Sequence, residues 1–367
     1  MRRTIRVLAI DGGGIRGIIP ARVLVEIEKL TRRPIAELFD LIVGTSTGGI
    51  LALGLTKPGS NGPAFSAAQL LDLYLNHGEN IFPHGGKPLI RNSGLFGDRS
   101  PLKQDATLGE RFKHFMGFAE IQKLASPFGG NPKFAGNARY FPDSFEELLF
   151  KYFGEAPLSV ALTDIIVTTY DMKAGVPILF SSSEAKHDSS RNPLMRHVAR
   201  ATSAGPTYFP PNSFQWGGDE RIMIDGGVFA NNPAMIGYIR GFELAEHDEG
   251  EPNVLLVSLG TGTPERASNE QITRETVMSE NWLSVARGIL NIVFNSISDN
   301  QDDLLQRLSR NSKGSFRYWR FQTVLRDASP ELDNVTPINL AALARAADEH
   351  VAAQKTALTD ITKQLLN

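Results

Sequence analysis

Short apolar runs recur along the chain, and each of the first two leads into a stretch with helical spacing. Such runs lie at 5–10, 39–43 and 254–259. They are rich in Val, Ile and Leu with little polar interruption, which is typical of strands buried on both faces. Helical spacing of apolar residues follows at 18–30, and a second helix is predicted over 50–55. Alternating strands and helices predict a mainly parallel sheet covered on both faces, a three-layer α/β/α fold.

The rest of the chain predicts further elements around one long interruption. Helices are expected over 144–153, 193–201 with Asn192 as N-cap, 282–308 and from 340; strands are expected at 164–170, 176–180, 221–224 and 316–324. The stretch 80–139 is rich in Gly, Pro and Phe, with a weak helix at 108–118, and predicts a surface excursion or a lid. We therefore expect one elaborated domain over 5–262, with an insertion at about 84–138. A helical extension over 263–367 is expected to pack on the same domain.

Composition narrows the function classes. The chain has 367 residues, a net charge of −2 and no cysteine. Disulfides, thiolate metal sites and cysteine nucleophiles are excluded, and no metal-ligand cluster or cofactor motif is visible, so neither a metal nor a cofactor is expected. The near-neutral charge argues against a dedicated nucleic-acid binder. The run after Met1 is too short for a secretory signal, and the apolar stretch 38–55 is broken by glycines, so we expect a cytoplasmic protein without a membrane span.

A Gly-x-Ser-x-Gly motif lies at Gly44–Gly48, between a predicted buried strand and a predicted helix. This context favours a nucleophile elbow, in which Ser46 is presented on a sharp turn. Gly44 and Gly48 support the turn, because strand and helix approach closely there. The helix also directs its positive end at the serine. The alternative is an ordinary turn serine.

A glycine-rich loop follows the first predicted strand. Glycines at 12, 13 and 14 can direct successive N–H groups at one point, where an oxyanion would bind. Arg16 would support this loop or contact a phosphate head group. The pattern Gly12-x-Gly14-x-x-Gly17 also matches the dinucleotide fingerprint, but the acidic residue expected at the end of the second strand is absent. A phosphate-binding P-loop is disfavoured because no Lys-Ser/Thr pair follows.

Asp225 ends a predicted strand and is followed by two glycines. A carboxylate within hydrogen-bond reach of a serine hydroxyl, in a site that limits solvation, can act as its base. The alternative is a turn-capping aspartate. None of the seven histidines lies in a turn at a predicted strand end, so a Ser46–Asp225 dyad is the simpler hypothesis.

Together these motifs resemble the patatin-like phospholipases, which are serine lipid acyl hydrolases with a Ser–Asp dyad. Their motifs are matched at 11–17, 44–48, 201–209, 225–227, 231–233 and 258–262. The resemblance spans roughly 6–262. It implies a catalytic domain of α/β hydrolase type over 5–262, with Ser46 as nucleophile, Asp225 as base and the N–H groups of Gly12, Gly13 and Gly14 as oxyanion hole.

The layout also looks like a bacterial subgroup of phospholipases activated by a cyclic dinucleotide in anti-phage defence. The partners implied are membrane phospholipid, attacked at the inner membrane surface, and a cyclic dinucleotide activator. Two other functions stay open: an esterase or acyltransferase on the same dyad, and a non-catalytic anion- or nucleotide-binding protein. The amphipathic stretch 282–308 would pack in the core or between subunits of a homo-oligomer.

Overall fold

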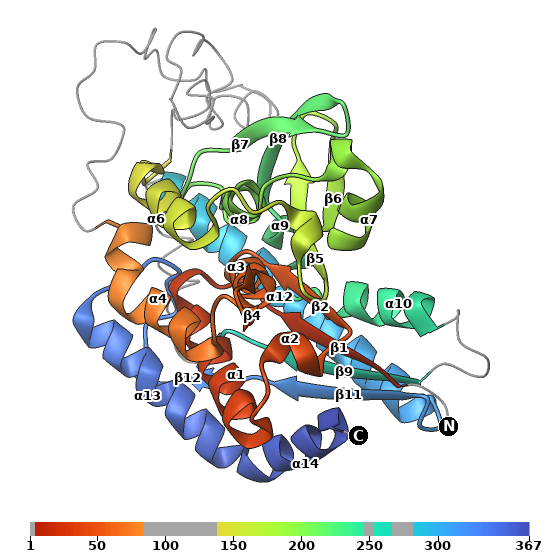
Figure 1. Ribbon diagram of the computed structural model, residues 1–367. Helices are drawn as coiled ribbons and strands as arrows, with labels where there is room; N and C mark the ends of the chain where they lie inside the picture. The colour runs from red at the N-terminus through yellow and green to blue at the C-terminus, as the bar shows by residue number, and fades with distance from the viewer. Residues whose placement is uncertain (1–3, 84–137, 246–252, 266–281, 367) are drawn as a thin grey trace, which may run out of the picture.

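The central sheet of this computed structural model holds eight strands (Figure 1). The structure describes residues 4–83, 138–245, 253–265 and 282–366. The parallel strands are β1 (Thr4–Ile10), β2 (Leu41–Thr45), β5 (Asp164–Asp171), β9 (Asn253–Leu259) and β11 (Phe316–Phe321). The antiparallel strands are β6 (Val176–Ser181), β7 (Asn212–Trp216) and β8 (Asp219–Asp225). The order is β11-β9-β1-β2-β5-β8-β7, and β6 pairs with β5.

Helices cover both faces of this sheet, as the alternation of side chains along a strand requires. Leu8 and Ile10 of β1 belong to one buried cluster, whereas Val7 and Ala9 belong to the other. The first cluster includes side chains of α1 (Ile18–Thr31), α3 (Thr47–Thr56), α4 (Ala67–Ile81), α13 (Pro337–Ala353) and α14 (Lys355–Leu366). The second includes side chains of α10 (Ala234–Ala245) and of α12 (Trp282–Asn311). The predicted three-layer fold with a mainly parallel sheet is confirmed.

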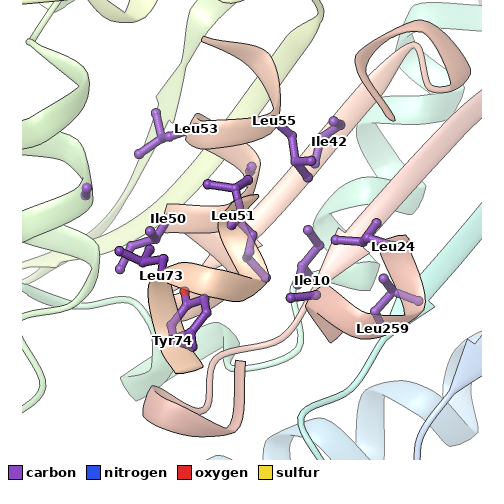
Figure 2. Packing of buried hydrophobic residues seen from close by; sticks show 14 of the residues in the cluster. Ile10, Leu24, Ile42, Ile50, Leu51, Leu53, Leu55, Leu73, Tyr74 and Leu259 are labelled. Carbon is purple, nitrogen blue, oxygen red and sulfur yellow. The ribbon is translucent and has the colours of Figure 1, made fainter. Parts of the chain in front are cut away.

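Helix α3 lies at the centre of the first layer, and every one of its residues is buried. Figure 2 shows Leu55 of α3 beside Ile42 of β2, and Leu73 and Tyr74 of α4 on the side of Ile50. A helix that is apolar all round is stable only when neighbours surround it. Its rigid packing fixes the N-terminal end, which follows Ser46.

The region after residue 262 is part of the sheet as well as of the helical layers. Strand β11 pairs in parallel with β9, so that Phe316 lies opposite Val254. The strand predicted at 316–324 is interrupted after Phe321, and β12 (Val324–Leu325) pairs instead with β10 (Thr263–Pro264). The interruption lets Gln322 accept a hydrogen bond from the N–H of Gly262.

Two predicted helix starts are wrong. Helix α8 (Met195–Thr202) has Leu194 as its N-cap, while Asn192 bonds through its side chain to Ser159. The cause is pairing of the 193–194 segment with residues 157–158, which keeps it extended. The C-terminal helical region begins at Pro337, with Thr336 as N-cap, and breaks into α13 and α14.

Shorter elements complete the described chain. They are α2 (Ile35–Leu38), α6 (Asp143–Phe153), α7 (Ser182–His187), α9 (Gly227–Ala230), β3 (Pro58–Gly59) and β4 (Gly62–Pro63), with single turns of 3-10 helix at 14–17, 158–160 and 189–191. Nearly all of the predicted insertion at 84–138, with its helix at 108–118, lies outside the described residues.

Candidate active site

Ser46 occupies a strained turn between β2 and α3. Its φ is 53° and its ψ −120°, a conformation that a residue with a side chain rarely adopts. Two hydrogen bonds stabilise the turn. The Ser46 N–H donates to Oγ1 of Thr202 over 2.8 Å, and that hydroxyl donates to the Thr168 carbonyl over 2.7 Å. The predicted strand–turn–helix context of Ser46 is therefore present.

The two glycines of the Gly-x-Ser-x-Gly motif lie where β2, α3 and β1 meet. A Cβ on Gly44 would overlap the carbonyl group of Gly48, and a Cβ on Gly48 would overlap the carbonyl of Ile10. Both obstructing groups are backbone, which cannot rotate away. Gly44 and Gly48 therefore permit the close approach that the elbow needs.

Asp225 reaches Ser46 through the strand register. Strand β6 pairs with β5 along 166–171, so β2 and β8 must share the other edge of β5. On that edge Thr45 pairs with Thr168, and Asp225 pairs with the next residue, Thr169. The end of β8 thus continues the line of β2, and Asp225 lies beside the turn that carries Ser46.

The carboxylate of Asp225 is buried and accepts few hydrogen bonds. Burial raises its pKa to about 7, against the opposing effects of hydrogen bonds from the Gly227 N–H and from the Ser46 hydroxyl. The Gly227 N–H donates to Oδ1 over 2.8 Å. A carboxylate with this pKa can accept a proton from a serine hydroxyl near neutral pH.

The glycine-rich loop lies at the same pocket, with one correction to the prediction. The N–H of Gly12 donates to the Asn231 carbonyl over 2.9 Å, so it is not free to bind an oxyanion. Gly13 and Gly14 line the pocket together with Ser46. Within the described part of the chain, no hydrogen bond engages the N–H groups of Gly13 and Gly14. Gly14 has a φ of 57°, which turns the backbone sharply.

Arg16 is buried and belongs to the glycine loop. Its guanidinium donates to the carbonyls of Gly13 over 3.4 Å and of Gly262 over 3.2 Å. Burial lowers its pKa to about 10, so the group stays charged at neutral pH. Of the two roles considered for Arg16, support of the loop fits this position; a head-group contact would need an exposed guanidinium.

An apolar pocket opens beside Ser46 and Asp225. Its wall includes Ile50, Tyr74, Ile81, Phe82, Phe145, Tyr208, Phe209, Phe294 and Leu332. The aromatic side chains pack on one another, with the rings of Phe145 and Phe209 stacked at 5.3 Å between centroids. Reactive polar groups at one side of an apolar pocket are typical of a site for an amphiphilic ligand.

One further polar group faces this pocket. Ser203 lines it and is buried, and its hydroxyl has no hydrogen-bond partner among the described residues. The hydroxyls of Thr47 and Tyr74 also lie on the pocket wall, but they bond to each other: the Thr47 hydroxyl donates to the Tyr74 hydroxyl over 2.5 Å. An unpartnered buried hydroxyl is costly, so Ser203 is a candidate contact for a bound molecule.

Of the described histidines, none lines the pocket, and the ring of His197 packs against that of Phe214. His84, His114 and His247 lie outside the described residues. No group of metal-ligating side chains able to hold an ion occurs in the described ranges.

The fold is a three-layer α/β/α arrangement, and the site pairs a strained serine with a buried aspartate beside a glycine loop. Residues 8–238 match the family model described as patatin-like phospholipase, and the chain belongs to this family. Membership supports a lipid acyl hydrolase activity.

Curated relatives agree with this membership. The chain is 32% identical to "Patatin-like protein 2" of Arabidopsis thaliana, over 94% of this chain and 82% of that protein. It is 33% identical to "Patatin-like protein 2" of Oryza sativa subsp. indica, but over 64% of this chain and 52% of the relative. It is 30% identical to "Probable inactive patatin-3-Kuras 1" of Solanum tuberosum, over 71% of this chain and 63% of the relative. The crystal structure of VipD from Legionella pneumophila superposes over 95% of this chain and 67% of its own, with a TM-score of 0.37 and 14% identity.

Three residues at this site were assigned no role from sequence. Thr202 supports the elbow, Leu332 accepts a hydrogen bond from the Ile15 N–H over 2.8 Å, and Arg320 contacts Asp11. The sequence held a signal for two of them: Thr202 lies in the matched motif 201–209, and Arg320 is one of two arginines inside the strand predicted at 316–324. A charged residue in a buried strand needs a partner, but the sequence does not name the partner.

Proposed function

We propose that this protein is a serine lipid acyl hydrolase that cleaves fatty-acyl esters of membrane phospholipids through a Ser46–Asp225 dyad. The observation that carries the proposal is the junction of β2 and β8 on one edge of β5, where the strained serine meets the buried carboxylate at an apolar pocket. Neither group alone would distinguish a hydrolase from a binding protein.

The reaction begins when Ser46 Oγ attacks the ester carbonyl and its proton passes to Asp225. The N–H groups of Gly13 and Gly14 then stabilise the tetrahedral oxyanion, a contribution of typically a few kcal/mol per donor. Collapse of the intermediate transfers the proton to the leaving alcohol and leaves an acyl ester on Ser46. Water, activated by the same carboxylate, attacks that ester and releases the fatty acid, so the products are a free fatty acid and a lysolipid.

The pocket supports a lipid rather than a small polar ester as substrate. Its wall is formed by aliphatic and aromatic side chains, which would bury an acyl chain and gain about 25 cal/mol for each Å² removed from water. No described helix is both long enough and apolar enough to cross a membrane. Access to lipid would then be peripheral, from the inner membrane surface.

The test is fatty-acid release from phospholipid vesicles by wild type, by Ser46→Ala and by Ser144→Ala. Ser144 lies on α6, where its hydroxyl bonds to the Asn80 carbonyl outside the pocket, so it is the matched control. We expect wild type and Ser144→Ala to release fatty acid and to react with a fluorophosphonate probe, and Ser46→Ala to do neither. Equal release by all three proteins would refute the dyad.

Two predictions depend on the family resemblance: activation by a cyclic dinucleotide and a role in anti-phage defence. A third, a homo-oligomeric state, depends on the amphipathic stretch 282–308. The same assay, run with and without cyclic dinucleotides, tests the first. Transfer of the acyl group to an added alcohol instead of water would favour the acyltransferase alternative. Absence of both probe labelling and fatty-acid release in wild type would favour a binding protein.

A further inference from the structure

Asp11, the residue before the glycine loop, forms a buried ion pair with a residue from the far end of the chain. Arg320 of β11 donates through Nη1 to Oδ1 over 2.9 Å and through Nη2 to Oδ2 over 2.6 Å. The side chains are 8% and 2% exposed, respectively. Two parallel charge-assisted bonds fix the orientation of both groups.

Neighbouring hydroxyls complete this pair. Ser298 of α12 donates to Oδ2 of Asp11 over 3.2 Å, and Nη1 of Arg320 also donates to Ser258 at the end of β9 over 2.8 Å. Burial raises the pKa of Asp11, and the charge and hydrogen bonds of Arg320 offset part of that rise. Satisfying a buried carboxylate in this way is required if it is to remain charged.

Apart from the Asn231 carbonyl, which accepts from the Gly12 N–H, the other partners of the loop come from the same late part of the chain. Thr261 donates to the Gly12 carbonyl over 2.8 Å, Arg16 donates to the Gly262 carbonyl, and the Leu332 carbonyl accepts from Ile15. Thr261, Gly262 and Leu332 lie beyond residues 8–238, the part that matches the family model. The loop that would hold the oxyanion is therefore positioned largely by residues that the family match does not cover.

We propose that Arg320 is a positioning residue of the acyl-transfer reaction: through Asp11 it fixes the backbone of Gly13 and Gly14 so that their N–H groups point at the reacting carbonyl. The inference rests on the proposed function. An oxyanion donor acts only when it is held in place before the reaction, and a misplacement of about 1 Å costs on the order of 100-fold in rate.

The test uses Arg320→Lys and Arg320→Met in the full chain, with two controls. Arg317→Met removes an exposed arginine of the same strand, one that bonds to Gln364. Arg221→Met breaks a pair with the fully buried Asp171, which does not contact the loop. Each protein is assayed for kcat and KM at a temperature where circular dichroism shows it folded, and for amide hydrogen exchange of residues 12–17.

We expect Arg320→Met to lower kcat about 10- to 100-fold with KM within about twofold, and Arg320→Lys to recover part of that loss. Exchange of the 12–17 amides rises in both variants and stays unchanged in Arg317→Met and Arg221→Met. If Arg320→Met does not fold, Arg320→Lys decides the question by the same two readouts.

Wild-type kcat and wild-type exchange in Arg320→Met, or in Arg320→Lys if the methionine variant does not fold, would overturn the inference, as would a kcat loss no larger than that of Arg221→Met. The exchange readout does not depend on activity. The wild type could prove to hydrolyse no lipid while amide exchange is still raised in the Arg320 variants. That result would support the positioning role and refute the proposed function.

Discussion

Ser46 and Asp225 lie close together beside one edge of β5, although they are 179 positions apart in the chain. Thr45 pairs with Thr168 and Asp225 with Thr169, so the parallel strand that delivers the serine ends where the antiparallel strand that delivers the carboxylate also ends. The switch from parallel to antiparallel pairing on β5 is thus what assembles the candidate dyad.

The pH dependence of hydrolysis should follow Asp225. Its pKa of about 7, raised by burial, means that the carboxylate needed as base is lost as the pH falls. We expect kcat/KM to rise from pH 5 to pH 8 with a midpoint near 7, measured with a monomeric ester substrate. A flat profile over this range would exclude Asp225 as the titrating base.

Asp225→Asn should remove activity and add stability. The base is lost, which costs roughly 100- to 10,000-fold in kcat. Because the folded pKa is raised above the unfolded value of 3.8, the carboxyl's favourable contribution exists at low pH and is lost as the pH rises toward 7. The variant should therefore exceed wild type by about 1–4 kcal/mol at pH 8 and by less at pH 5 in urea unfolding. A variant less stable than wild type at pH 8 would contradict this.

Thr202→Val should weaken the elbow, and Thr202→Ser should preserve it. Valine leaves the Ser46 N–H and the Thr168 carbonyl without the hydroxyl that now bonds to both. We expect a loss of about 1–3 kcal/mol in stability and a lower kcat for the valine variant. The serine variant retains the hydroxyl, so equal behaviour of the two would show that these hydrogen bonds do not matter.

Gly48→Ala should be poorly tolerated for a packing reason. The added methyl group would overlap the Ile10 carbonyl at the crossing of α3 and β1. We expect a loss of about 1–3 kcal/mol or failure to fold, together with loss of probe labelling at Ser46. Gly175→Ala is the comparison, since its φ is 72° but no atom lies within 4 Å of the new methyl group. Equal melting temperatures for the two variants would argue against crowding at the elbow.

Ser203→Ala should separate substrate binding from stability. The hydroxyl has no partner among the described residues, so its removal should leave the melting temperature unchanged or slightly higher. If a bound lipid supplies the partner, kcat/KM for phospholipid should fall by about five- to tenfold, the equivalent of one hydrogen bond. Fluorophosphonate labelling of Ser46 should persist. Unchanged hydrolysis would mean that Ser203 does not contact the substrate.

The local motifs were sufficient to predict most of what surrounds Ser46. A buried strand, two glycines around a serine and an apolar helix can form only a close strand–helix junction, and that junction is present at β2 and α3. The three-layer fold followed from the same alternation of strands and helices. These predictions drew on local spacing, where side-chain periodicity and glycine sterics dominate.

Other features depended on partners distant in the chain. Pairing with residues 157–158 overrode the helix-start signal at Asn192, and the Asn231 carbonyl removed Gly12 from the free donors. The Arg320–Asp11 pair joins residues 309 positions apart. The sequence by itself determined the elbow, the glycine loop and the layers, because each follows from local spacing. Only the tertiary structure decided which N–H groups stay free, which strand edge Asp225 shares with Ser46 and which arginine holds the loop, because hydrogen-bond partners and desolvation are set by whichever segments pack together.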